Sequence, residues 1–208
     1  MRKVNQDSFC IQQNLAGHVS GLWIMGVMDG HGQNGHQVSH FCKKMIPEAL
    51  THFVGGAAPK DLAYVSPRLV NKRKRGGQND ATENSGLDNT ADGFLPKITA
   101  GNPDSVQNAD TWLSTDYKKR DKQIQNAFEI TEEKLDLESK IDAMFSGTTS
   151  VYCFLSNNHL VCANSGDSRA ILCSLVNGGW QVTQLTRDHK PEEADEAARV
   201  RRCNGRIE

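Results

Sequence analysis

Long apolar runs are missing from this 208-residue sequence. A transmembrane helix needs about 20 consecutive apolar residues, and no stretch approaches that length. No apolar segment follows the opening residues 1–4, so we expect no secretory leader. Position 2 also lacks the glycine that N-myristoylation requires. We therefore expect no membrane partner and an intracellular location, with cytoplasm and nucleus left undistinguished.

An excess of charge of one sign is missing too. The sequence has 24 basic and 25 acidic side chains, and its formal net charge is −1. This balance predicts no broad electrostatic surface for nucleic acid or anionic lipid. The basic run at residues 72–75 is a local exception, typical either of a nuclear-localisation or nucleic-acid patch or of a solvated loop. The near-zero net charge favours the loop, so we expect no nucleic-acid partner.

Several short enzyme and metal signatures are also absent. The cysteines form no C-x-x-C pair, which excludes zinc-ribbon and thioredoxin-type motifs. We interpret most of the six cysteines as reduced, buried thiols of an intracellular protein. The segment 146–150 lacks the lysine and the spacing of a P-loop, and no G-x-S-x-G elbow occurs.

The composition that is present favours a globular chain with one interruption. Apolar residues make up 37% of the sequence and charged residues 24%, and the length suffices for one domain with a sizeable core. Residues 1–54 and 116–208 have globular composition. Residues 55–115 are rich in Gly, Asn, Asp, Ser and Pro, which predicts a long, weakly ordered insertion that could be deleted with little loss of stability.

Apolar periodicity predicts alternating helices and strands in the two globular blocks. Helices are expected at 35–53, with a possible bend at Pro47, at 116–143, and after Pro191. Strands are expected at 8–12, 22–28, 148–155, 159–164, 170–175 and 180–185. The segments 156–158 and 177–179 are hairpin signals between these strands. The pattern predicts an α+β layered domain with antiparallel sheets.

Two aspartates lie at predicted strand ends. Asp7 stands at the start of one strand and Asp29 where a buried strand stops, so both can lie at a sheet edge. Carboxylates and a main-chain carbonyl, such as that of Gly30, are the ligands that Mg²⁺ and Mn²⁺ prefer. His31 follows directly, and a histidine beside such a site can donate a proton near neutral pH. On these residues alone, turn and cap roles remain equally open.

A third polar signal lies between two apolar strands, at Gly166, Asp167, Ser168 and Arg169. A tight hairpin turn would account for the Gly-Asp pair. It does not account for the arginine that follows at once.

Five motifs taken together resemble the metal-dependent protein serine/threonine phosphatase family of the 2C type. They are Asn5-Gln6-Asp7; Asp29-Gly30-His31-Gly32 with Gly35 beyond it; Ser146-Gly147-Thr148-Thr149; the segment 164–170; and the segment 185–191 with Glu196, Arg199, Asn204 and Gly205 beyond it. They occur in the family's order and cover both globular blocks. The resemblance implies two packed antiparallel β-sheets flanked by helices, with a di-metal site at one end.

The resemblance also implies an activity and a role for each matching residue. The activity is hydrolysis of phosphoserine and phosphothreonine in phosphoprotein substrates by a metal-activated water. Asp7, Asp29 and the carbonyl of Gly30 would hold two Mg²⁺ or Mn²⁺ ions, with Asp29 bridging them. His31 would protonate the leaving oxygen, Arg2 would bind phosphate, and Asp167 would help to hold a third ion.

The chain departs from the family pattern at its C-terminal side. Two further metal-binding aspartate motifs of the family would follow Glu208, so we expect a single, incomplete phosphatase domain over residues 1–208, and a monomer. The chain can be a fragment, a partial gene product or a short paralogue. The competing function is a non-catalytic member of the same fold that binds a partner or a phosphoprotein without turnover.

Overall fold

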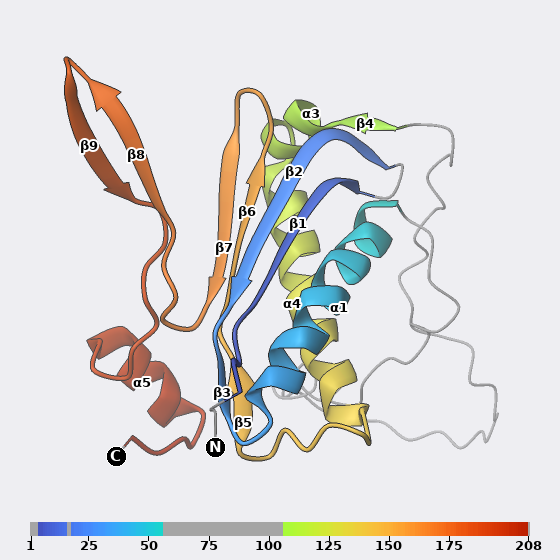
Figure 1. The fold of residues 1–208 in the computed structure, drawn as a ribbon, viewed down its shortest axis with the longest axis vertical. Coiled ribbons are helices and arrows are strands. Elements are labelled where there is room, and N and C mark those ends of the chain that lie inside the picture. The colour runs from blue at the N-terminus through green and yellow to red at the C-terminus, as the bar shows by residue number, and fades with distance from the viewer. Residues whose placement is uncertain (1–3, 16–17, 56–105, 208) are drawn as a thin grey trace, which may run out of the picture.

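The computed structural model describes residues 4–15, 18–55 and 106–207. Its centre is an antiparallel sheet in the order β1-β2-β6-β7 (Figure 1). These strands span Ser8–Leu15, Val19–Met28, Ser150–Leu155 and Leu160–Ser165. The short strand β4 (Gln107–Asn108) pairs in parallel with the start of β2. The predicted strands in these regions are confirmed, and β1 extends three residues beyond its predicted end at residue 12.

One face of this sheet is the core of the molecule. Because side chains alternate along a strand, Leu22, Ile24 and Met28 of β2 share a face, and all three are fully buried. Tyr152 and Phe154 of β6 lie on the same face, with their rings stacked 6.3 Å apart. Helices α1 (Gly35–Gly55) and α4 (Tyr117–Leu137) pack side by side over this face (Figure 1).

The two long helices differ from the sequence prediction in detail. Helix α1 continues through Pro47, as predicted, and ends at Gly55, two residues beyond the predicted end at 53. Helix α4 begins after the N-cap Asp116, whose carboxylate accepts a hydrogen bond from the N–H of Lys119 at 3.0 Å. It ends at Leu137 and not at the predicted 143, because Glu138 adopts an extended backbone with ψ 97°. The chain then loops back toward α1, where the Asn34 amide donates to the Asp142 carbonyl at 2.9 Å.

The predicted insertion is wrong at its C-terminal end. Helix α3 (Ala109–Ser114) follows β4, and Ala109, Trp112 and Leu113 are buried. The Trp112 ring meets Phe154 edge-on at 5.9 Å. Residues 107–114 are therefore part of the folded core, because their apolar side chains pack against the main sheet. Residues 56–105, with the basic run 72–75, lie outside the described residues.

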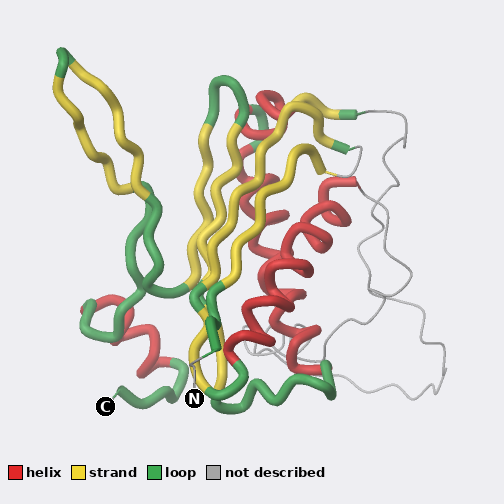
Figure 2. The backbone as a smooth tube through the Cα atoms, viewed as in Figure 1, coloured by secondary structure: helices red, strands yellow, loops and turns green. Residues whose placement is uncertain are grey.

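Two smaller antiparallel pairs complete the described fold. Strands β3 (Gly30–Gly32) and β5 (Ser146–Thr148) pair next to the main sheet, where the sequence predicted a turn at 29–32. Strands β8 (Ile171–Val176) and β9 (Gly179–Gln184) form a hairpin that stands apart from the main sheet (Figure 2). Its turn places Asn177 and Gly178 at positive φ (51° and 81°), as a two-residue Asn-Gly turn requires. Helix α5 (Ala194–Arg202) ends the described chain.

The predicted class, antiparallel sheets flanked by helices, is confirmed. In the described residues, however, helices cover only one face of the main sheet, and β8 and β9 pair only with each other. The opposite face carries the exposed apolar side chains of Phe9, Ile11, Trp23 and Val27. None of the helices within the described ranges is long and apolar enough to cross a lipid bilayer.

The cysteines are all free thiols, but their burial varies. Cys42 is buried, and this burial raises the pKa of its thiol to about 11. Burial, together with the nearby Cys153, raises the pKa of Cys162 to about 12, and the two sulfur atoms lie 3.3 Å apart on β6 and β7. Cys10, Cys153 and Cys162 are half-buried, and Cys173 and Cys203 are exposed, so the interpretation of most cysteines as buried thiols is wrong.

Candidate metal-binding and catalytic site

The register of β1 and β2 brings Asp7 and Asp29 to the same end of the main sheet. Ser8 pairs with Met28 across the two strands. Asp7 directly precedes Ser8 and Asp29 directly follows Met28, so the two aspartates lie at neighbouring strand ends. Both are exposed, and their carboxylates make no hydrogen bond or ion pair with any described residue. These carboxylates are therefore available to a ligand.

The chain on both sides of Asp7 is anchored to a buried serine of α1. The Ser39 hydroxyl donates to the carbonyl of Gln6 at 2.6 Å. It also lies 3.0 Å from the hydroxyl of Ser8. Ser39 is fully buried, so these contacts are shielded from water. Helix α1 thus fixes the backbone on either side of Asp7.

Gly30 lies where three backbone segments meet. A Cβ atom at this position would come within 2.4 Å of the carbonyl oxygens of Gln6 and of Gly35. Only glycine avoids that overlap. The Gln6 side-chain amide also donates to the carbonyl of Gly32 at 2.8 Å. The segment that leads into Asp7 is therefore packed directly against the segment that follows Asp29.

His31 is held by the short β3–β5 pair. It pairs with Gly147, and a Cβ atom on that glycine would lie 2.8 Å from two atoms of the His31 ring. The imidazole therefore rests on the backbone of β5, and a larger residue at 147 would displace it. His31 is exposed and lies two residues beyond Asp29 in the sequence.

Thr149 joins the segment of Asp29 to the segment of Asp167. The Asp29 N–H donates to the Thr149 hydroxyl at 3.0 Å, and the Thr149 N–H donates to the Asp29 carbonyl at 2.9 Å. The same hydroxyl lies 2.6 Å from that of Ser168. A Cβ atom at Gly166 would come within 2.8 Å of the Thr149 methyl group. The loop that carries Asp167 is thus packed onto the residue that holds Asp29.

Arg169 has a structural role that the sequence left unexplained. Its guanidinium donates two hydrogen bonds to the Asp188 carboxylate, at 2.9 and 2.7 Å. These bonds hold the pKa of Asp188 at about 2, well below its ordinary value. Asp188 is 11% exposed in its side chain, whereas Arg169 is half exposed. The pair ties the loop 166–169 to the segment that precedes α5.

The available donors fit a hard divalent cation only in part. Asp7, Asp29 and the Gly30 carbonyl offer oxygen ligands near one sheet end, which is the chemistry that Mg²⁺ and Mn²⁺ prefer. Over the ranges that the structure describes, however, no group of three or more His, Cys, Asp or Glu side chains is gathered closely enough to hold a metal. Asp167 is exposed on its loop and does not complete such a group. Arg2 lies outside the described residues.

Sequence reasoning missed three residues that position this site. Ser39 lies inside a helix, and nothing in the local sequence marks it as a contact of the Asp7 segment. Gly147 and Thr149 belong to a motif that the family resemblance includes, but their contacts come from chain segments more than 100 residues away. The pairing of β3 with β5 and that of β2 with β6 bring these segments together.

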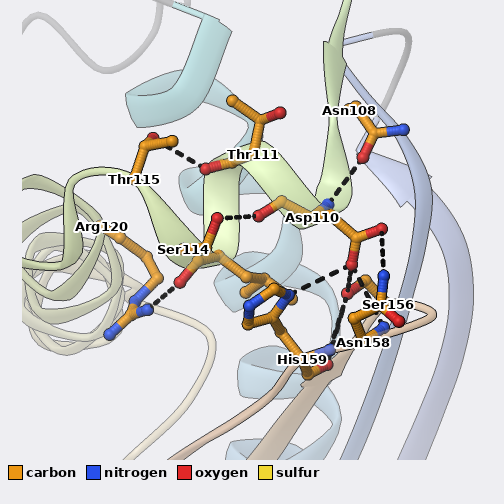
Figure 3. Close-up of polar contacts among 10 residues, drawn as sticks. Asn108, Asp110, Thr111, Ser114, Thr115, Arg120, Ser156, Asn158 and His159 are labelled. Carbon is orange, nitrogen blue, oxygen red and sulfur yellow. Dashed lines mark hydrogen bonds and ion pairs between the residues drawn. The ribbon is translucent and has the colours of Figure 1, made fainter.

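A second polar cluster, at the other end of the sheet, was not predicted (Figure 3). The Asp110 carboxylate accepts hydrogen bonds from the Ser156 hydroxyl and from the N–H of Asn158, and it lies 3.2 Å from Nδ1 of His159. These bonds, that of Ser156 foremost, lower the pKa of Asp110. Serine and histidine both contact one oxygen, Oδ1, so the serine is not placed to pass a proton to the histidine. These contacts connect α3, through Asp110, to the turn between β6 and β7.

A groove of about 720 Å³ lies between α1, α4 and the inner face of β6 and β7. Apolar residues such as Ile46, Ile124 and Phe128 line much of it. Neither Asp29 nor His31 is among its lining residues. The groove does reach Gly147 of β5, which supports His31, so it borders the candidate site without including these two residues.

Comparisons with known proteins agree with the motif series. A family model described as "Protein phosphatase 2C" matches residues 94–208, more than half of the chain. Probable protein phosphatase 2C 14 of Oryza sativa subsp. japonica is 31% identical over 205 residues, which cover 98% of this chain and 35% of the relative. Probable protein phosphatase 2C 33 of Arabidopsis thaliana is 27% identical and is covered over 41% of its length.

The fold agrees as well. The crystal structure of a serine-threonine phosphatase 2C from Toxoplasma gondii matches with a TM-score of 0.59 at 18% identity, covering 97% of this chain and 51% of that one. The chain thus spans about half of that solved structure and a smaller share of the two plant relatives. By its family-model match and its relatives, this chain belongs to the protein phosphatase 2C family.

Proposed function

We propose that this chain carries the metal-binding and proton-donating part of a centre that hydrolyses phosphoserine and phosphothreonine in proteins. The β1–β2 register carries the proposal, because it sets Asp7 and Asp29 at neighbouring strand ends. Their carboxylates are unpaired among the described residues, and His31 stands two residues beyond Asp29. The family membership supports the reaction class.

Asp7, Asp29 and the Gly30 carbonyl would hold Mg²⁺ or Mn²⁺ through oxygen. The ions, when bound, supply electrophilic stabilisation of the phosphoryl oxygens and lower the pKa of water. The contribution of the chain is placement: Ser39 fixes the backbone around Asp7, and Thr149 fixes that of Asp29. Asp167 would add a further carboxylate from its loop.

In the rest of the proposed reaction, one side chain donates a proton to the leaving group and another neutralises the charge of the phosphoryl group. His31, resting on Gly147, would donate a proton to the departing serine or threonine oxygen as its bond to phosphorus breaks. Water would attack phosphorus in line with that bond, without a covalent enzyme intermediate. Arg2 would meet the negative charge of the phosphoryl oxygens with its guanidinium.

Release of phosphate from a phosphothreonine peptide in Mn²⁺ tests the proposal. Asp29→Asn should lower turnover by at least about 100-fold, because removing a ligand exceeds the 10- to 100-fold cost of removing its supporting residues. Asp121→Asn is the control: this exposed carboxylate of α4 pairs with Arg120 and lies outside the candidate site, so the change should leave turnover at the wild-type level. Measurable turnover by the wild-type chain that Asp29→Asn leaves unchanged would overturn the assignment.

A second candidate function is a phosphoprotein-binding module of the same fold. It is favoured by one observation: among the described residues, no group of three metal-binding side chains forms. Such a module would bind the phosphothreonine peptide in a one-to-one complex and release no phosphate. Calorimetric titration beside the phosphate assay distinguishes the two functions.

A further inference from the structure

The hydroxyl of Thr149 contacts two segments at once. A hydroxyl has one donor hydrogen and two acceptor lone pairs. It can therefore accept the Asp29 N–H at 3.0 Å and also bond to Ser168 at 2.6 Å. Thr149 is 8% exposed, so water competes little for either bond.

The methyl group of Thr149 adds a packing contact to the same loop. A side chain at Gly166 would meet that methyl at 2.8 Å, and Gly166 adopts φ 102°, which favours glycine. Gly166 and Ser168 flank Asp167 in the sequence. The backbone on both sides of Asp167 is thus fixed by one side chain, just as Ser39 fixes both sides of Asp7.

We infer that Thr149 is a positioning residue that sets the Asp167 loop relative to Asp29, and through this the affinity of the site for a divalent cation. The inference rests on the proposed function for its metal part. The coupling of the two segments stands on the contacts alone. If Thr149 served only in packing, its substitution would lower the stability of the fold, and metal affinity would fall no more than in an equally destabilised control.

Two substitutions separate the hydroxyl from the methyl group. Thr149→Val keeps the branched shape and removes the hydroxyl, whereas Thr149→Ser keeps the hydroxyl and removes the methyl group. Thr131→Val is the matched control, because Thr131 is also buried and its hydroxyl donates to the Ala127 carbonyl within α4. Circular dichroism and thermal melting establish that each variant is folded.

The first measurement is amide hydrogen exchange without metal. Thr149→Val should speed the exchange of the Asp29 amide and of residues 166–168 by about fivefold, since it removes a hydrogen bond of about 1 kcal/mol from each segment. Thr149→Ser keeps the hydroxyl and loses only the methyl contact with Gly166. It should leave the Asp29 amide close to wild type and speed the exchange of residues 166–168 less than Thr149→Val does. Thr131→Val should leave both segments close to wild type. Unchanged exchange in residues 166–168 of Thr149→Val would overturn the coupling.

The second measurement is the Mn²⁺ affinity of the full chain by calorimetry. Thr149→Val should weaken it about tenfold, the lower end of the effect of residues that support a metal ligand. The Mn²⁺ affinity of Thr149→Ser, which keeps the hydroxyl, should lie within about threefold of that of the wild-type chain. Equal losses in Thr149→Val and Thr131→Val would show a general stability effect and refute the positioning role. If the wild-type chain binds no Mn²⁺, the proposed function fails, and the exchange data alone decide the coupling.

Discussion

The hydroxyl of Ser39 in α1 donates a 2.6 Å hydrogen bond to the carbonyl of Gln6, the residue before Asp7. We expect Ser39→Ala to lower the free energy of unfolding by about 1 kcal/mol, because it removes a partly buried hydrogen bond to the Gln6 carbonyl. Ser114→Ala, an exposed serine that bonds within its own helix, should cost less than about 0.5 kcal/mol. Urea unfolding measures both variants, and equal losses would contradict the anchoring role of Ser39.

Gly30 should tolerate no side chain. Alanine there would place its Cβ 2.4 Å from two backbone oxygens, which cannot shift as a flexible side chain would. We expect Gly30→Ala to cost about 3 kcal/mol or to prevent folding. At Gly179 the nearest atom to an added Cβ is 3.7 Å away, so Gly179→Ala is the control and should behave like wild type. Comparable melting temperatures for the two variants would refute this packing argument.

Trp112 tests the corrected boundary of the insertion. Trp112→Ala should cost about 3–5 kcal/mol, the usual loss for a buried aromatic ring. Replacing residues 56–105 by a short Gly/Ser linker should cost far less, as their composition predicts. Chemical denaturation of the two variants compares these losses. A larger loss from the linker replacement than from Trp112→Ala would show that the 56–105 segment contributes to the core.

The Arg169–Asp188 pair should make stability depend on acid pH. The folded pKa of Asp188 is about 2 and its ordinary value is 3.8, so the carboxylate stabilises the fold above pH 3.8. That contribution is lost as the pH falls through the folded pKa. Arg169→Gln should therefore melt below wild type at pH 6, and the difference should shrink as the pH falls from 4 to 2. A difference that stays constant over that range would refute the linkage.

A matched variant controls for the loss of one positive charge. Arg201 is exposed on α5, and Arg201→Gln removes the same charge. It should show no such narrowing between pH 4 and 2. The Lys190 ammonium also lies 3.5 Å from the Asp188 carboxylate. In Arg169→Gln it should therefore still lower the pKa of Asp188 slightly, and a small dependence of stability on acid pH should remain.

The sequence predicted the parts of the fold that local pattern determines. A continuous apolar run located β2, although the burial on both faces that such a run favours is wrong, because Trp23 and Val27 are exposed. An Asn-Gly turn located the β8–β9 hairpin. Asp7 and Asp29 were identified because each lies at the end of an apolar strand. Local pattern does not specify which surface a strand covers, so it could not show that Trp180 and Val182 of β9 are exposed.

The supporting contacts of the site were beyond sequence reasoning for a related reason. Thr149 meets Asp29 across 120 residues, and Ser39 meets Gln6 across 33, so neither contact follows from spacing. Helix α3 did carry a signal, since Ala109, Trp112 and Leu113 recur at i, i+3 and i+4. The helix was not predicted because the residues around it are mostly polar, and the composition of the whole segment is typical of a loop.

The central claim is that Asp7 and Asp29 together bind a divalent cation, and Mn²⁺ titration by calorimetry tests it most directly. With two carboxylates, the wild-type chain should bind Mn²⁺ saturably with a dissociation constant on the order of 10⁻⁴ M or weaker, because few charged ligands give weak sites. Asp7→Asn and Asp29→Asn should each weaken binding at least about tenfold, while Asp121→Asn leaves it unchanged. Wild-type affinity in both Asp7→Asn and Asp29→Asn would contradict the claim.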